Sequence, residues 1–155
     1  MGVFNLFSRH RWDAENDRDG FRHLRIAIGE RLGARTLGGS LYELPSGERT
    51  WPYHYEDGCE EWLIVVSGRP TLRVPEGERQ LEAGDIAVFP EGPDGAHQVI
   101  NRSDKGCRLL ILSTKAPVAV VHYPDSAKVG FWSSAAGHQK LLSDGPGLDY
   151  WEGEA

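Results

Sequence analysis

The most informative part of the sequence is WPYHYEDGCEEWLIVVSG, Trp51–Gly68, where possible metal ligands directly precede an apolar run. Four polar side chains lie within eight residues of one another: His54, Glu56, Glu60 and Glu61. A carboxylate beside a buried strand is costly to desolvate unless a positive group faces it. We therefore expect a cation, a basic side chain or solvent against these carboxylates.

The alternation of side chains along a strand separates these residues into faces. His54 and Glu56 share one face, so two possible ligands converge there. In the next run Glu61 shares its face with Leu63 and Val65, which predicts an interior carboxylate at the end of a strand. The opposite face is also apolar and needs a cover from another sheet or a second subunit, which predicts a homodimer; this face consists of Glu60, Trp62, Ile64 and Val66.

The rest of the chain predicts an all-β protein. Nineteen glycines and nine prolines accompany 39% hydrophobic residues, a composition that favours many turns and short strands. About nine β-prone runs are separated by turn signals, which is typical of a sandwich or barrel. These runs are 37–44, 50–55, 60–67, 71–74, 79–83, 86–90, 96–101, 107–113 and 118–123.

A length of 155 residues fits a single domain, residues 1–155, with an arm at 1–36, a β-barrel at 37–122 and a tail at 123–155. Within the arm, residues 21–34 predict one helical turn or an edge strand. The tail is mostly turn chemistry, and we expect its four aromatic side chains to dock it onto the barrel or a partner. They are Phe131, Trp132, Tyr150 and Trp151.

Composition excludes several kinds of partner and site. Seventeen basic and 23 acidic residues give a net charge of −6, which disfavours nucleic acid and favours a small molecule. No apolar run approaches the roughly 20 residues that cross a bilayer, and no signal peptide is recognisable, so we expect no membrane association and a cytoplasmic location. Cys59 and Cys107 form no CxxC motif and are expected to be reduced. No phosphate-binding loop, GxSxG or HExxH motif occurs.

Two spaced motifs resemble those of the cupin superfamily, G-x5-H-x-H-x3-4-E-x6-G and G-x5-P-x-G-x2-H-x3-N. The first is matched by Gly47, His54, Glu61 and Gly68, with one extra residue before His54, and the second by Gly84, Pro90, Gly92, His97 and Asn101. Segments such as PYHYE and GRPTLR also resemble small single-domain cupin (type 2) proteins, a group without an assigned reaction. The resemblance implies the cupin double-stranded β-helix, a jelly-roll barrel, over about residues 37–122.

In cupins the metal ligands come from the histidines and glutamate of these motifs, so the resemblance implies His54, Glu61 and His97 as ligands. Glu56 stands where the motif has its second histidine, and by position it is a plausible fourth ligand. The other departure is Pro93-Asp94-Gly95-Ala96, four residues where the motif has two. The ligand set suits a divalent Mn, Fe, Ni or Zn ion without choosing among them.

Two carboxylates on one divalent ion neutralise its charge, which makes it a milder Lewis acid. This argues against vigorous hydrolysis and is compatible with an isomerase, an oxygenase, or a protein that only binds or senses a small polar metabolite. A metal-free epimerase that uses histidine as base and tyrosine as acid is a weaker alternative. Without a metal, the histidines would be hydrogen-bonded core residues and Glu56 would pair with Arg or Lys. No catalytic residue follows from the sequence.

Overall fold

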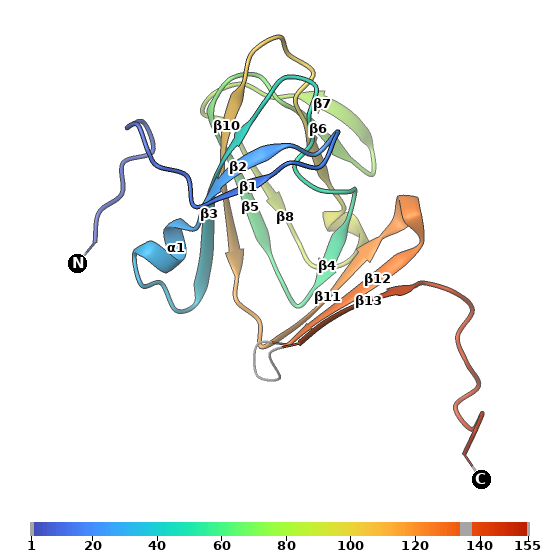
Figure 1. Cartoon of the computed structure of the whole chain (residues 1–155). Helices are drawn as coiled ribbons and strands as arrows, with labels where there is room; N and C mark the ends of the chain where they lie inside the picture. Colours follow the sequence, from blue (N-terminus) through green and yellow to red (C-terminus); the bar gives the residue numbers. More distant parts are fainter. Residues whose placement is uncertain (1, 134–137, 155) are drawn as a thin grey trace.

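The computed structural model describes residues 2–133 and 138–154, and its regular secondary structure is almost entirely antiparallel β-strand, as predicted (Figure 1). One short helix, α1, spans Ile28–Arg31, and two 3-10 turns, η1 and η2, span Pro93–Gly95 and Pro124–Ser126. The strands of the described residues are β1 Ala14–Asn16, β2 His23–Ile26, β3 Leu37–Leu44, β4 Tyr55–Asp57, β5 Glu61–Ser67, β6 Thr71–Val74, β7 Gly77–Gln80, β8 Ile86–Phe89, β9 Gln98–Ile100, β10 Cys107–Thr114, β11 Val118–Tyr123, β12 Lys128–Ser133 and β13 His138–Ser143.

Three sheets build the fold. The largest has the order β1-β2-β3-β10-β5-β8, and the smaller ones have the orders β7-β6-β9 and β13-β12-β11-β4. Inward side chains of the large sheet, such as Leu63 and Leu109, pack against Leu72 of β6 and Val99 of β9 in one buried cluster. Apolar burial between the facing sheets stabilises this jelly-roll arrangement, and it leaves the ends of the inward rows free for polar side chains.

The N-terminal segment covers part of the outer face of the large sheet. Phe4, Leu6 and Trp12 pack with Val66 and Leu110 over a second buried cluster. Farther along the same face Trp62 of β5, Ile86 and Val88 of β8 stay 41%, 61% and 45% exposed. The N-terminal segment therefore covers one end of this outer face, and the end formed by Trp62, Ile86 and Val88 stays exposed.

Two regions differ from the sequence-based expectation. Residues 50–54 are mostly bends, with a single bridge at His54, and the strand β4 begins at Tyr55. Beyond Tyr123 the prediction of mostly turns was wrong, because β12 and β13 form a hairpin that pairs with β11. Residues 21–34 contain both of the expected alternatives, the strand β2 and the helical turn α1.

Candidate metal centre

His54 and His97 face each other across a short backbone bridge. The His54 amide donates to the His97 carbonyl at 3.1 Å, and the His97 amide donates to the His54 carbonyl at 2.8 Å. Such a closely paired antiparallel bridge directs both side chains to one face. The ring centroids lie 4.7 Å apart, and both side chains are buried.

Backbone carbonyls orient both imidazoles. Nδ1 of His54 lies 2.9 Å from the Pro52 oxygen, and Nδ1 of His97 lies 3.0 Å from the Gly95 oxygen. Because a carbonyl only accepts, each Nδ1 carries the proton and each Nε2 presents a lone pair. Phe89 stacks on the His97 ring with centroids 3.6 Å apart, which restricts its rotation further.

Glu61, the first residue of β5, brings a carboxylate to the same point. Its Oε2 lies 3.4 Å from Nε2 of His97 and 3.9 Å from Nε2 of His54. One ligand atom from each of the three residues lies within 4.8 Å of the others. Three acceptor atoms therefore face one another, and their mutual repulsion is relieved only by a proton or a cation between them.

Burial controls the protonation of this cluster. Desolvation lowers the pKa of His54, and desolvation together with the adjacent His54 lowers the pKa of His97 to about 3. Desolvation and the nearby Glu56 carboxylate raise the pKa of Glu61 to about 8. Both imidazoles are thus neutral, the form that binds a metal, and an ionised Glu61 needs a positive partner.

The cluster fits a divalent transition metal. Nitrogen and oxygen ligands bind such ions at about 2.0–2.2 Å, so neighbouring ligand atoms are separated by roughly 3–4 Å. The Nε2 to Oε2 distances of 3.4 and 3.9 Å agree with that spacing. Hydrogen bonds from ligating imidazoles to backbone carbonyls, as at Pro52 and Gly95, are a common supporting feature of metal sites.

Glu56, the expected fourth ligand, lies beside the cluster and is not part of the group of three. It is close enough to raise the pKa of Glu61, and its own pKa is raised by burial. Its carboxylate contacts the buried Cys59 thiol, whose pKa desolvation raises to about 11. In the described part of the chain no Arg or Lys forms an ion pair with Glu56. Its role as a ligand stays a prediction.

The four-residue departure from the motif forms the turn η1 and preserves the position of His97. The Gly92 amide donates to the Glu56 carbonyl at 2.9 Å, and the Gly95 amide donates to the Gly92 carbonyl at 3.0 Å. A Cβ on Gly95 would overlap the Pro90 carbonyl oxygen. The longer turn is therefore accommodated by its tight local geometry, and the paired histidines remain opposite each other.

Several neighbours of the cluster were not identified from the sequence. Tyr123 lies over His54 with ring centroids 6.1 Å apart, and burial raises its pKa, so its phenol is a neutral donor. Ser113 of β10 is the direct strand partner of Glu61. Both positions depend on which strands pair, and the alternation within one strand carries no signal for that. Glu60, by contrast, is exposed as expected and accepts a hydrogen bond from Trp62 Nε1 at 2.8 Å.

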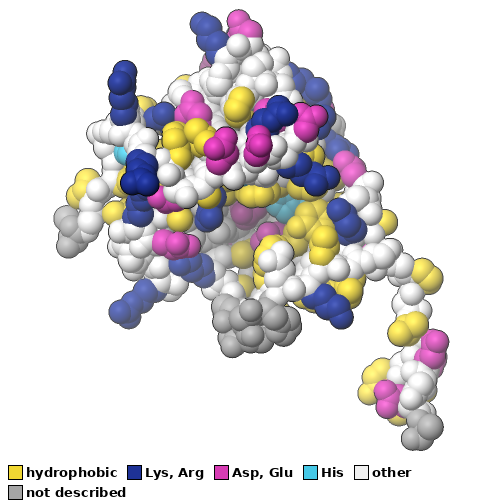
Figure 2. Space-filling view, viewed as in Figure 1, with side chains coloured by type: hydrophobic (Ala, Val, Ile, Leu, Met, Phe, Trp, Pro, Cys, Tyr) yellow, Lys and Arg dark blue, Asp and Glu magenta, His cyan; other side chains and the backbone are white. Residues whose placement is uncertain are grey.

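The cluster opens to solvent. In the space-filling view a histidine and neighbouring acidic side chains lie at the bottom of a hollow (Figure 2). A cleft of about 840 Å³ beside the cluster is lined by Glu56 and Cys59 together with Arg25, Arg35, Tyr42, Trp51, Ser113, Thr114, Lys115, Ala116, Pro117, Ala119 and Trp132. A small polar molecule can therefore reach this end of the fold. No described helix has the length and apolar character needed to cross a membrane.

Comparisons with known proteins place this architecture. Residues 40–113 match the family model of the cupin domain. The fold matches a protein from Acidithiobacillus ferrooxidans provisionally described as a sugar phosphate isomerase, with 23% identity, a TM-score of 0.81 and 91% of both chains covered. It also matches a sugar phosphate isomerase of the cupin superfamily from Silicibacter pomeroyi, with 26% identity, a TM-score of 0.76, and 85% of this chain and 82% of that chain covered.

A more distant structural match is oxalate decarboxylase from Lactobacillus farciminis, with 21% identity, a TM-score of 0.53, and 67% of this chain and 31% of that chain covered. A search of curated proteins finds no match. The fold and the histidine–glutamate cluster define a small jelly-roll protein with a possible metal site. The match of residues 40–113 to the cupin-domain model, together with these structural neighbours, supports a small cupin-domain protein.

Proposed function

We propose that this cupin holds a divalent Mn, Fe, Ni or Zn ion through His54, Glu61 and His97, with Glu56 as a fourth ligand, and isomerises a small sugar phosphate. The convergence of two imidazole nitrogens and one carboxylate oxygen within 4.8 Å of one another carries the metal assignment. The substrate class is supported by the Silicibacter pomeroyi isomerase, which matches this chain at 26% identity.

The residues suit a reaction without net oxidation. In an aldose–ketose interconversion a proton moves between neighbouring carbons while a hydroxyl proton passes to the carbonyl oxygen. The bound metal would supply Lewis acidity that polarises the carbonyl. Tyr123 offers a neutral phenol near His54 for a hydrogen bond to the substrate. Glu61 and the two oriented imidazoles fix the ligand geometry in advance.

Elemental analysis of protein purified without a metal-affinity tag tests the metal centre. We expect about one divalent ion per chain in the wild type, and a loss of most of it in His54→Ala and Glu61→Gln. His122→Ala is the matched control, since His122 bonds Asp57 at 3.1 Å, outside the cluster. Absence of metal after reconstitution, or equal metal in all variants, would contradict the proposal.

A non-catalytic binding or sensing role is the second candidate. Glu56 in place of the second motif histidine favours it, because an additional carboxylate weakens the Lewis acidity of a bound ion. A thermal-shift screen of sugar phosphates, keto acids and amino acids, with and without each metal, separates the two roles. Stabilisation with turnover indicates the isomerase, and stabilisation without turnover indicates a sensor.

We also propose that the protein is a homodimer. The support is the exposed apolar side chains on the outer face of the large sheet, Trp62, Ile86 and Val88. In the register of the sheet, Trp62 lies opposite Val88 and Ile64 opposite Ile86, so they form one continuous surface. Isolated exposed apolar residues need no cover, whereas a contiguous patch commonly marks an interface.

A further inference from the structure

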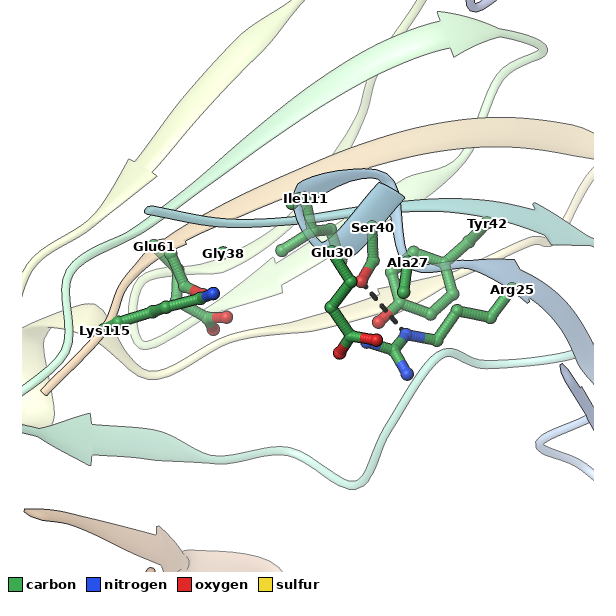
Figure 3. A pocket seen from close by; sticks show the side chains of 12 residues that line it. Arg25, Ala27, Glu30, Gly38, Ser40, Tyr42, Glu61, Ile111 and Lys115 are labelled. Atoms are coloured by element: carbon green, nitrogen blue, oxygen red, sulfur yellow. Dashed lines mark hydrogen bonds between the residues drawn. The ribbon is translucent and has the colours of Figure 1, made fainter. Parts of the chain in front are cut away.

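A second, smaller cavity adjoins the candidate metal centre and shares Glu61 with it. It encloses about 200 Å³. Figure 3 shows Lys115 entering from the end near Glu61 and Arg25 from the other end. Two hydroxyl-bearing residues, Ser40 and Ser113, also line it. The cavity is therefore polar, and it contains two cations beside the ligand cluster.

The register of the large sheet creates this space. Ser113 of β10 lies opposite Glu61 of β5 on one side and Gly38 of β3 on the other. A Cβ on Gly38 would approach the Ser113 hydroxyl oxygen to 2.7 Å, closer than real Cβ contacts. The missing side chain at Gly38 therefore leaves room over the Ser113 hydroxyl, one strand away from the Glu61 carboxylate.

The cations of this cavity are not neutralised by acids. Nε of Arg25 donates to Ser40 Oγ at 3.0 Å, and Nζ of Lys115 donates to the Ala34 carbonyl at 3.1 Å. Neither forms an ion pair with any residue that the structure describes, whereas five other arginines do: Arg22, Arg31, Arg73, Arg102 and Arg108. The Arg25 guanidinium also hydrogen-bonds the Tyr42 phenol, and its positive charge has no acidic partner among the described residues.

Two acids also line the cavity, and neither cancels this charge. Glu61 directs its carboxylate to the two imidazoles, 3.4 Å from Nε2 of His97. Glu30 of α1 is exposed and makes no ion pair with Arg25 within the described residues. A dianion entering the cavity would therefore meet Arg25 and Lys115, with Glu30 as the one free opposing charge on its wall.

We propose that Arg25, Lys115, Ser40 and Ser113 bind the phosphate monoester of the substrate, while its carbonyl end reaches the metal centre across Glu61. This assignment rests on the proposed function. The wider cleft of about 840 Å³ shares Arg25 and Lys115 and adds Arg35. The whole chain has a net charge of −6, so three cations around the opening of this cleft would concentrate an anionic substrate there.

The test is calorimetric titration of inorganic phosphate into metal-free protein. Arg25→Gln is expected to raise the dissociation constant for phosphate about tenfold or more, since it removes a charge-assisted contact. Gly38→Ala should raise the dissociation constant by a similar factor while keeping every charge, because the added Cβ occupies part of the cavity. Glu30→Gln should lower the dissociation constant about two- to threefold by removing the opposing charge. Melting temperatures confirm that each variant is folded.

Arg49→Gln is the matched control, because Arg49 lines a separate basic groove of about 680 Å³ with Arg18, Arg73, Arg102 and Lys128. An unchanged affinity in Arg25→Gln, or a loss in Arg49→Gln, would overturn the assignment. Acetate binding more tightly than phosphate would also overturn it, since it indicates a carboxylate site. Measuring phosphate without metal separates this result from the metal analysis, so either proposal can fail alone.

Discussion

Asn101, the last residue of the second motif, is buried and bonded at every position of its amide. Its Nδ2 donates to the carbonyls of Leu44 at 3.0 Å and Lys105 at 2.8 Å. Its Oδ1 accepts from the Ser103 amide at 3.1 Å and hydroxyl at 2.6 Å. One side chain thus joins the end of β3 to the turn before β10, which explains structurally why this position suits asparagine.

Replacing Asn101 by Ala is expected to lower the free energy of unfolding by about 2–4 kcal/mol, because the buried groups that bond the amide lose their hydrogen-bond partner and a small cavity remains. Urea denaturation monitored by circular dichroism measures the loss. Ser103→Ala is the control and should cost about 1 kcal/mol, since Asn101 keeps its other partners. Equal losses in both variants would mean that the amide contributes little.

At this scale, the sequence could predict which residues converge but not what surrounds them. Alternation placed His54 and Glu61 on inward faces, and the motif added His97; the structure brings ligand atoms of these three within 4.8 Å. Arg25 and Ser113 could not be found in this way. Their position depends on pairing between strands that are distant in the sequence, which local patterns do not encode.

Gly68 directly follows β5, where the chain passes close to Cys107, the first residue of β10. Its φ is +88°, and a Cβ there would lie 2.5 Å from the Cys107 Cβ. Gly68→Ala should therefore combine left-handed strain with overpacking and cost roughly 2–4 kcal/mol. Gly84 has a similar φ of +97° but nothing within 4 Å, so Gly84→Ala should cost only about 1 kcal/mol. Thermal unfolding of both variants compares the two, and equal costs would exclude overpacking at Gly68.

An ion pair links the strand β6 to the turn η2, which lies between β11 and β12. Arg73 of β6 donates two hydrogen bonds to Asp125 of η2, at 2.6 and 2.9 Å, and these bonds hold the pKa of Asp125 below its usual range. Because the folded-state pKa is depressed, the stabilisation is present above the unfolded pKa of about 4 and disappears as pH falls through the folded pKa. Half of the Asp125 side chain is exposed, which keeps the contribution small.

Asp125→Asn should therefore lower the melting temperature by a few degrees at most at pH 7, and by less at pH 3, because pH 3 lies below the unfolded pKa of about 4 and part of the stabilisation is already lost there. Thermal unfolding of both proteins at the two pH values measures this difference. Asp104→Asn, an exposed substitution with no ion pair in the described residues, controls for the change in net charge. A difference that grows toward pH 3 would contradict the sign of the argument.

Elements with strong local signals were predicted well. The expected run 37–44 is the strand β3, and the run 118–123 is β11. The hairpin of β12 and β13 was missed because its sequence is rich in Gly and Ser, and its strands are held by pairing with β11. Around Pro52 a strand was predicted where the chain forms bends, since proline lacks the amide hydrogen that a paired strand requires.

The proposed dimer belongs to the scale of the whole molecule. Ile86→Glu would place a charge within the apolar face of the large sheet, where it should weaken self-association at least about tenfold. Sedimentation velocity over a concentration series measures this change. Leu148→Glu is the control, since Leu148 is 80% exposed in the C-terminal segment, away from that face. A wild type that stays monomeric at high concentration would contradict the proposal.

The carbonyls of Pro52 and Gly95 have a thermodynamic consequence for ion uptake. They hold both imidazole rings in one orientation and one tautomer, and Phe89 restricts the His97 ring further. These side chains thus lose their rotational freedom when the chain folds, so binding of the ion costs little further side-chain entropy. Entropy of uptake would then come chiefly from water leaving the hydration shell of the ion.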